Sequence, residues 1–135
     1  MRLVALVLFA FGIVAGIATP LRAQKPALAM LDELEKGRWE LRVRGEESGV
    51  QRMCLGDARR LIQLKHSSIP NCERLVVLDS SDAVTIQYTC RGNGYGRTSI
   101  RRETARLVQI ESQGIADGLP FSFHAEARRV GACSE

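Results

Sequence analysis

The chain has 135 residues, with 19 Lys and Arg against 15 Asp and Glu, so its formal net charge is +4. This length allows one domain and excludes a multidomain enzyme. The sequence contains neither a Gly-x-Ser-x-Gly elbow nor a Cys-x-x-Cys pair, so no decisive catalytic motif stands out. It therefore says more about the compartment and the stabilisation of the protein than about its ligand.

Residues 1–23 have the pattern of a secretory signal peptide. Arg2 precedes an apolar run from Leu3 to Ala18, Pro20 breaks that run, and the small residue Ala23 precedes a polar segment. We expect cleavage after Ala23. The alternative is an uncleaved anchor, because the apolar run is close to the minimum of roughly 17 residues for a spanning helix.

Cleavage would leave 112 residues with 17 basic and 15 acidic side chains, a net charge of only +2. We therefore expect no nucleic-acid partner, since that charge is small and aromatic residues are few. The first cysteine is Cys54, so none is available for lipid attachment at a new N-terminus. The expected location is periplasmic or secreted, with no transmembrane segment after cleavage of the signal peptide.

Two short helices are expected in the first half of the chain. Residues 24–36 form a lead-in whose Leu28–Lys36 segment has leucines at helical spacing and is followed by Gly37. A second helix is expected over Gly56–His66, with Asp57 as its N-terminal cap.

The rest of the chain alternates like β-strands. Residues 38–44 alternate strictly, with Trp39, Leu41 and Val43 on one face. Further strands are expected at residues 50–55, 75–79, 84–90, 98–103, 106–112 and 119–130. In two of them the inward residues are expected to be Val84, Ile86, Tyr88 and Cys90, and Leu119, Phe121, Phe123, Ala125 and Ala127.

Short turns join these strands, among them the glycine-rich segments 92–96 and 114–118. The sequence therefore predicts one α+β, mostly β domain over residues 37–135. We expect an antiparallel meander of six or seven strands, curled into a half-barrel or a closed barrel, with one or two short helices.

The four cysteines are the strongest chemical signal. An even number in an exported chain indicates disulfides, and four allow three pairings. If residues 80–82 form a three-residue turn, Asp79 faces Ala83 and Cys72 faces Cys90. Facing Cα atoms lie roughly 4.5–5.5 Å apart, which is within reach of a disulfide.

The preferred pairing is therefore Cys72–Cys90 with Cys54–Cys133, and the alternative is Cys54–Cys72 with Cys90–Cys133. A redox or metal site is disfavoured, because the cysteines are 18, 18 and 43 residues apart and zinc sites use close ligand pairs. We expect no metal and no cofactor.

Several short segments occur together in an order typical of one protein family. They are Gly37-Arg38-Trp39-Glu40, Cys54-Leu55, Tyr88-Thr89-Cys90 and Arg129-Val130-Gly131-Ala132-Cys133. With the signal peptide, this set resembles domain-of-unknown-function family 3617, small exported proteins of proteobacteria. The resemblance implies an exported, disulfide-bonded domain and supplies no catalytic residues. The turn after Gly45 is shorter here than the Met/Pro-rich insert of the family.

His124, Glu126 and Arg128 would project from one face of the last strand. Such a set offers two metal ligands or an acid/base pair. The alternative is a solvated polar face, which we favour because a metal site needs more ligands and His66, the other histidine, lies at a helix end.

Three further features have structural alternatives that we favour. Asp57 could be a catalytic carboxylate, but a helix cap explains it. The segment Gly92–Gly96 resembles part of a phosphate-binding loop, but a strand follows it where a helix is needed. Three arginine pairs could form an anion-binding patch, but adjacent strand residues point to opposite faces; these pairs are Arg59-Arg60, Arg101-Arg102 and Arg128-Arg129.

The leading hypothesis is an exported, non-enzymatic protein that binds an anionic envelope component or a small apolar ligand, or supports the envelope. The alternative is a periplasmic protein inhibitor, because Tyr88-Thr89-Cys90-Arg91-Gly92 is similar to part of the C-type lysozyme inhibitors of bacteria. A protruding loop would favour the inhibitor, and a pocket containing His124 and Glu126 would favour an enzyme. A closed barrel with an apolar lumen would favour a lipid or small-molecule binder.

Overall fold

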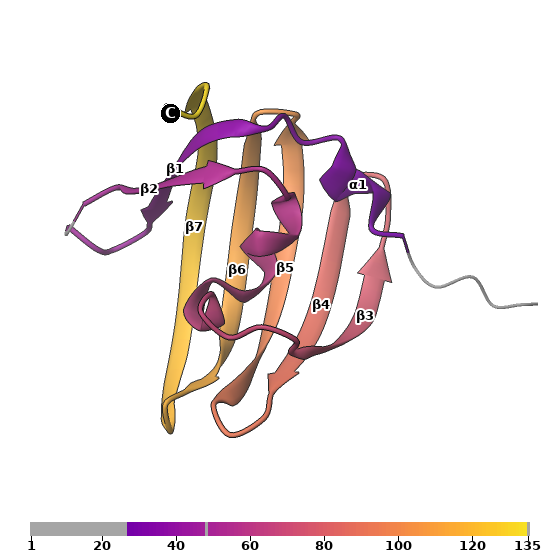
Figure 1. The fold of residues 1–135 in the computed structure, drawn as a ribbon, viewed down its shortest axis with the longest axis vertical. Coiled ribbons are helices and arrows are strands. Elements are labelled where there is room, and N and C mark those ends of the chain that lie inside the picture. The colour runs from indigo at the N-terminus through magenta and orange to yellow at the C-terminus, as the bar shows by residue number, and fades with distance from the viewer. Residues whose placement is uncertain (1–26, 48, 135) are drawn as a thin grey trace, which may run out of the picture.

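The computed structural model describes residues 27–47 and 49–134 of the chain, so the expected signal peptide 1–23 lies outside the described residues. Seven antiparallel strands form one open sheet in the order β2-β1-β7-β6-β5-β4-β3 (Figure 1). The strands are β1 (Gly37–Val43), β2 (Gln51–Leu55), β3 (Glu73–Asp79), β4 (Ala83–Cys90), β5 (Gly94–Thr104), β6 (Leu107–Ala116) and β7 (Leu119–Gly131). The expected mostly-β antiparallel fold is confirmed, and the sheet does not close into a barrel.

The strand order departs from a simple meander at one point. β3 to β7 follow one another across the sheet, but β1 lies between β2, its neighbour in the chain, and β7, the last strand. The chain leaves β2 at one edge, crosses one face of the sheet as the 3-10 helix η1 (Ala58–His66), and starts β3 at the other edge (Figure 1). The face that η1 covers holds the core.

Alternation along the strands explains the core. Trp39, Ile86 and Ile100 are fully buried, and η1 adds Leu61 and Ile62. The expected inward face of β4 is confirmed, since all four of its inward residues are buried. The expectation for Leu119 is wrong: its exposed fraction is 70%. It pairs with Ala116 beside the turn of the β6–β7 hairpin, where the core has ended.

Both helices are shorter than the sequence predicts. α1 spans only Ala29–Asp32, because the chain then turns to pair with the sheet: the Glu35 N–H donates to the carbonyl of Ala105. η1 begins at Ala58 rather than Gly56, and Asp57 caps it by accepting a hydrogen bond of 2.9 Å from the Arg59 N–H. The capping role expected of Asp57 is confirmed.

In the β3–β4 hairpin the two cysteines are aligned as expected, although the turn between the strands differs from the expected one. Asp79 pairs with Val84 rather than with Ala83, because the Ser80 hydroxyl accepts the Ala83 N–H and makes the turn one residue longer. A bulge between Val76 and Leu78 offsets the extra residue, so Glu73 and Thr89 pair as expected.

The disulfides are Cys72–Cys90, with Cα atoms 4.4 Å apart, and Cys54–Cys133. This is the preferred pairing of the two that the sequence left open. The first bond fastens the start of the edge strand β3 to the end of β4. The second fastens β2, at the opposite edge, to the segment that follows β7.

Candidate functional site

A groove of about 980 Å³ lies along the edge strand β3, between that strand and η1. We call it the β3 groove. Ligand pockets in proteins commonly measure about 300–1,000 Å³, so its size fits a small ligand or a short chain segment. Its lining residues are Ala27, Leu28, Arg59, Gln63, Ser67, Ser68, Ile69, Pro70, Asn71, Cys72, Arg74, Leu75 and Val76.

The pairing of β3 with β4 explains which side chains enter the groove. Arg74 pairs with Tyr88 and Val76 with Ile86, whose side chains point toward the core, so Arg74 and Val76 lie on the same face as η1. Leu75 points to the other face and is 64% exposed. Because three successive residues of β3 line the groove although their side chains alternate, the groove reaches the backbone edge of the strand.

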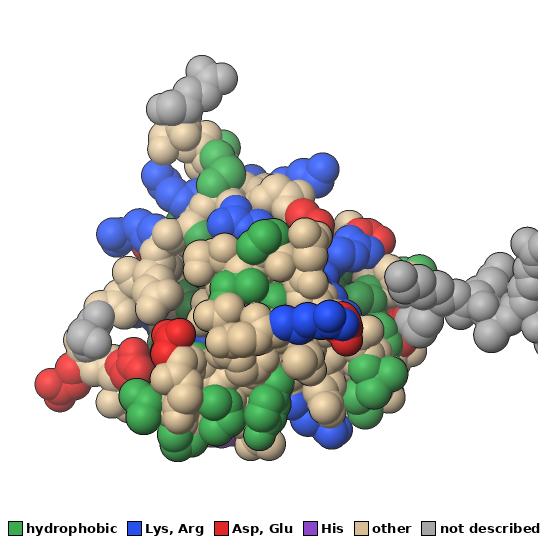
Figure 2. Space-filling model, turned by 60° about the horizontal axis from the view of Figure 1, so that its bottom comes forward, with side chains coloured by type: hydrophobic (Ala, Val, Ile, Leu, Met, Phe, Trp, Pro, Cys, Tyr) green, Lys and Arg blue, Asp and Glu red, His purple; other side chains and the backbone are tan. Residues whose placement is uncertain are grey.

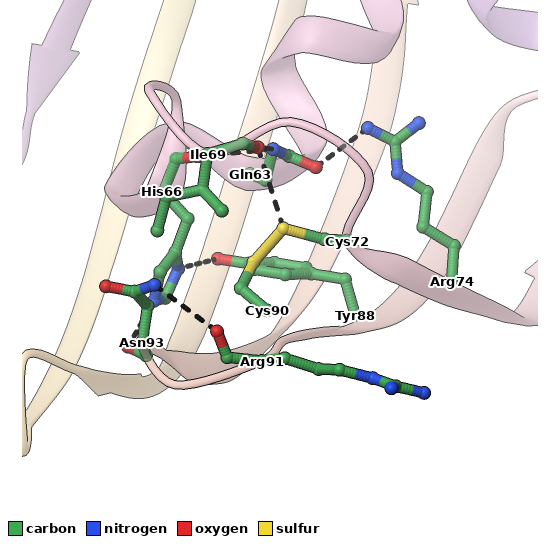
Figure 3. Close-up of a disulfide and its surroundings, with 9 residues drawn as sticks. All are labelled: Gln63, His66, Ile69, Cys72, Arg74, Tyr88, Cys90, Arg91 and Asn93. Carbon is green, nitrogen blue, oxygen red and sulfur yellow. Dashed lines mark hydrogen bonds between the residues drawn. A yellow bond between two sulfur atoms is a disulfide. The ribbon is translucent and has the colours of Figure 1, made fainter.

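Gln63 holds the polar wall of the groove together (Figure 3). Its buried amide nitrogen donates to the carbonyl oxygens of His66 and Ile69, at 3.2 and 2.9 Å. Its amide oxygen accepts a hydrogen bond of 2.8 Å from the Arg74 guanidinium. One side chain therefore fixes both the loop after η1 and the position of the Arg74 charge.

The two arginines of the groove differ in their partners. Arg59 donates to both carboxylate oxygens of Asp32, at 2.6 and 3.1 Å, and to the carbonyl of Ala27 at 2.9 Å. This hydrogen-bonded ion pair lowers the pKa of the Asp32 carboxyl and raises that of the Arg59 guanidinium. Arg74 makes no ion pair with any described residue. Its positive charge is therefore available to an anion.

The region behind the groove is a closed polar network. His66 contacts the Tyr88 hydroxyl through Nδ1 at 3.0 Å and the Asn93 carbonyl through Nε2 at 3.1 Å. Since a carbonyl only accepts, we assign the ring hydrogen to Nε2, and Nδ1 accepts from Tyr88. Burial raises the pKa of Tyr88 from the ordinary 10.0 to about 12, so this donor stays protonated beyond the pH at which an exposed tyrosine ionises. These groups are satisfied and hold the fold.

The surface site predicted at His124, Glu126 and Arg128 does share one face of β7, but its members are paired with neighbours in solvent. His124 lies 3.4 Å from Glu111, and both side chains are more than half exposed. Glu126 accepts hydrogen bonds of 3.2 Å from Arg128 and from Gln109. The solvated-face interpretation therefore agrees with the geometry.

His124 borders hollows of about 220 and 390 Å³ on the outer face, and neither is lined by Glu126 or Arg128. Across residues 27–47 and 49–134, no three His, Cys, Asp or Glu side chains come close enough to hold a metal ion.

The arginine pairs do not form one patch. Arg101 contacts Glu103, whereas its neighbour Arg102 contacts Glu33 and the carbonyl of Ser81. On the face seen in Figure 2, basic side chains are separated by hydrophobic and uncharged surface. The glycines that resemble part of a phosphate-binding loop also have a structural explanation. Gly94 and Gly96 belong to β5, where a Cβ atom at Gly94 would meet the backbone of Ile115 and one at Gly96 would meet the Tyr88 ring.

Sequence reasoning missed Arg74 and Gln63. Arg74 stands at an inward position of a strand, which is a weak signal for a special role, because inward positions are usually apolar. Nothing in the sequence shows that Gln63, eleven residues earlier, reaches it.

Comparison with known proteins gives no relative: no family model, curated protein or solved structure matches this chain. The resemblance to family 3617 therefore stays an expectation. Among the described residues, neither helix has the length or the apolar character needed to cross a membrane.

Proposed function

We propose that this chain is an exported, disulfide-stabilised binding protein without enzymatic activity, and that the β3 groove is its ligand site. The observation that carries the proposal is the Arg74 guanidinium, held by Gln63 at the wall of a partly apolar groove and unpaired with any acid among the described residues. The groove suits a ligand that combines apolar and anionic parts.

Two features support export. All four cysteines form disulfides, which persist in oxidising compartments and are rare in the reducing cytosol. The N-terminal sequence also has the pattern of a cleaved signal peptide. The proposed location is the periplasm or the extracellular space.

The composition of the groove supports binding rather than catalysis. Its lining includes Ser67 and Ser68 but no His, Asp or Glu that could activate a hydroxyl as a nucleophile. Its positive charge would attract anions and hold them by charge-assisted hydrogen bonds.

The inhibitor alternative has no specific observation in its favour. Of the fragment that suggested it, Tyr88 and Cys90 are buried, one bonded to His66 and the other in a disulfide. Arg91 is exposed, but it pairs with Glu73 at 2.8 Å. Binding in the β3 groove is therefore the one function that we propose.

The ligand-site proposal is tested with anilinonaphthalene sulfonate, a fluorescent probe that joins apolar rings to an anionic group. We expect saturable binding that Arg74→Glu weakens about tenfold or more, since a charge-assisted contact becomes a repulsion. Arg97→Glu is the matched control, because Arg97 is an exposed arginine on the other face of the sheet. Equal binding by the two variants would contradict the proposal.

Export is tested on protein recovered from the periplasm. We expect the intact mass of residues 24–135 less four protons, and non-reducing peptide maps that contain the Cys72–Cys90 and Cys54–Cys133 links. Retention of residues 1–23 together with free thiols would contradict an exported, disulfide-bonded protein.

A further inference from the structure

The free edge of β3 lies directly beside the groove. Within residues 27–47 and 49–134, β3 ends the sheet and has a paired neighbour on one side only. Alternate N–H and C=O groups of such an edge strand point away from the sheet and can pair with another extended chain. The regular part of this edge is Glu73–Val76, because the ladder is interrupted between Val76 and Leu78.

The two faces of this edge differ in chemistry. On the face toward η1, Arg74 offers a charge and Val76 an apolar surface in the groove that Ile69 also lines. On the opposite face Leu75 is 64% exposed and Leu78 is 46% exposed. An extended chain along this edge would meet alternating surfaces, and a period of two residues is the spacing at which a strand presents its side chains.

We propose that the β3 edge and groove bind an extended segment of a partner protein, which adds to the sheet as an eighth strand and places an acidic side chain against Arg74. This inference rests on the proposed function and names its ligand class. The feature that favours a peptide over an acyl chain is that the groove reaches the backbone of Arg74, Leu75 and Val76. An acyl chain would leave those backbone groups without partners.

The register gives the sequence pattern of the segment. Every neighbouring pair of strands in this sheet is antiparallel, so we take the added strand to run antiparallel to β3. The residues of the added strand opposite Val76 and opposite Arg74 would face the groove, the first apolar and the second acidic. The residue between them, opposite Leu75, would also be apolar and would cover the Leu75 side chain.

Charge complementarity selects this occupant over a second copy of the chain. A symmetric antiparallel pair of β3 strands centred on Leu75, within the regular part of the edge, would place Arg74 opposite the apolar Val76. A second copy in this register would leave the Arg74 charge without a partner. An acidic residue of a partner segment opposite Arg74 instead supplies the negative charge that Arg74 needs as a partner.

The test uses a synthetic heptapeptide of Thr, Val and Leu with one central Glu, acetylated and amidated so that the side chain is its only carboxylate. Binding to the full oxidised protein is followed by titration calorimetry. We expect Arg74→Glu to weaken binding of this peptide about tenfold or more and to improve binding of the same peptide with Lys in place of Glu. Arg74→Lys keeps the charge, so its affinity for the Glu peptide is expected to lie between those of Arg74→Glu and the parent protein. Arg97→Glu is expected to bind this peptide with the affinity of the parent.

The outcomes separate this inference from the proposed function. If Arg74→Glu weakens binding of the fluorescent probe but the parent protein binds neither peptide, the peptide class is wrong and an amphipathic small molecule is the ligand. A concentration-dependent dimer that Arg74→Glu abolishes would assign the edge to a second copy and overturn the inference. If Arg74→Glu changes neither the binding of the probe nor the binding of the peptides, the proposed function itself is overturned.

Discussion

The ring of Tyr88 lies directly against Gly96 of the neighbouring strand. The two residues are cross-strand partners, and a Cβ atom at Gly96 would lie 2.5 Å from the Tyr88 hydroxyl oxygen. The ring cannot swing away without cost, because its hydroxyl is bonded to His66 at 3.0 Å. The glycine in β5 is therefore a packing requirement of β4 and η1, which together support the wall of the β3 groove.

Gly96→Ala is expected to lower the free energy of unfolding by about 1–3 kcal/mol, the usual cost of overpacking a core. Urea denaturation measures this. Gly56→Ala is the matched control, because a Cβ atom there meets nothing within 4 Å. If both variants unfold at the same urea concentration, the Tyr88–Gly96 contact does not constrain the fold.

Alkaline pH is expected to destabilise the protein through Tyr88. Burial raises the pKa of its hydroxyl in the folded state to about 12, above the value of 10.0 for an unperturbed tyrosine. The folded state therefore binds more protons than the unfolded state between these values, so the free energy of unfolding falls as pH rises from about 10 to about 12. Below about pH 10 this contribution is fully present.

Urea denaturation across that pH window tests the assignment. Tyr88→Phe is expected to show a smaller loss of stability than the parent protein, since it has no hydroxyl to ionise. Tyr95→Phe is the control, because Tyr95 is 50% exposed. An equal loss of stability in the parent and Tyr88→Phe would show that other groups cause the alkaline sensitivity.

The two disulfides are expected to contribute unequally. They join cysteines that are 79 and 18 residues apart. On the chain-entropy model, loops of these lengths correspond to about 4.5 and about 3 kcal/mol. Replacing Cys54 and Cys133 by Ala is therefore expected to lower the urea midpoint more than replacing Cys72 and Cys90. The opposite ranking would show that local packing around Cys90 matters more than loop entropy.

The polar face of β7 is expected to tolerate substitution. His124→Ala, Glu126→Gln and Arg128→Gln each remove a contact between partly exposed groups, which is worth little. We expect changes within about 0.5 kcal/mol in urea denaturation and no change in binding of the fluorescent probe. If any of these variants lost probe binding, the ligand site would lie on the outer face of the sheet and not in the β3 groove.

Strand alternation and turn residues are enough to predict most of the sheet from the sequence. Val84, Ile86 and Tyr88 could be placed inward because the side chains of a strand alternate with a period of two, whatever its neighbours are. The Cys72–Cys90 pairing was predicted from the same regularity, and it holds because the bulge between Val76 and Leu78 offsets a turn one residue longer than expected. Asp57 could be assigned as a cap because capping depends only on residues nearby in the chain.

The tertiary structure alone decided the candidate site. The groove exists because η1 crosses the sheet and β3 is left at its edge, and both facts depend on how β1 packs beside β7. Arg74 and Gln63 meet only because the loop between η1 and β3 folds back, and no spacing in the sequence encodes that contact. Local patterns fix which way a side chain points along its own strand, whereas a site assembled from two elements depends on the packing of the whole chain.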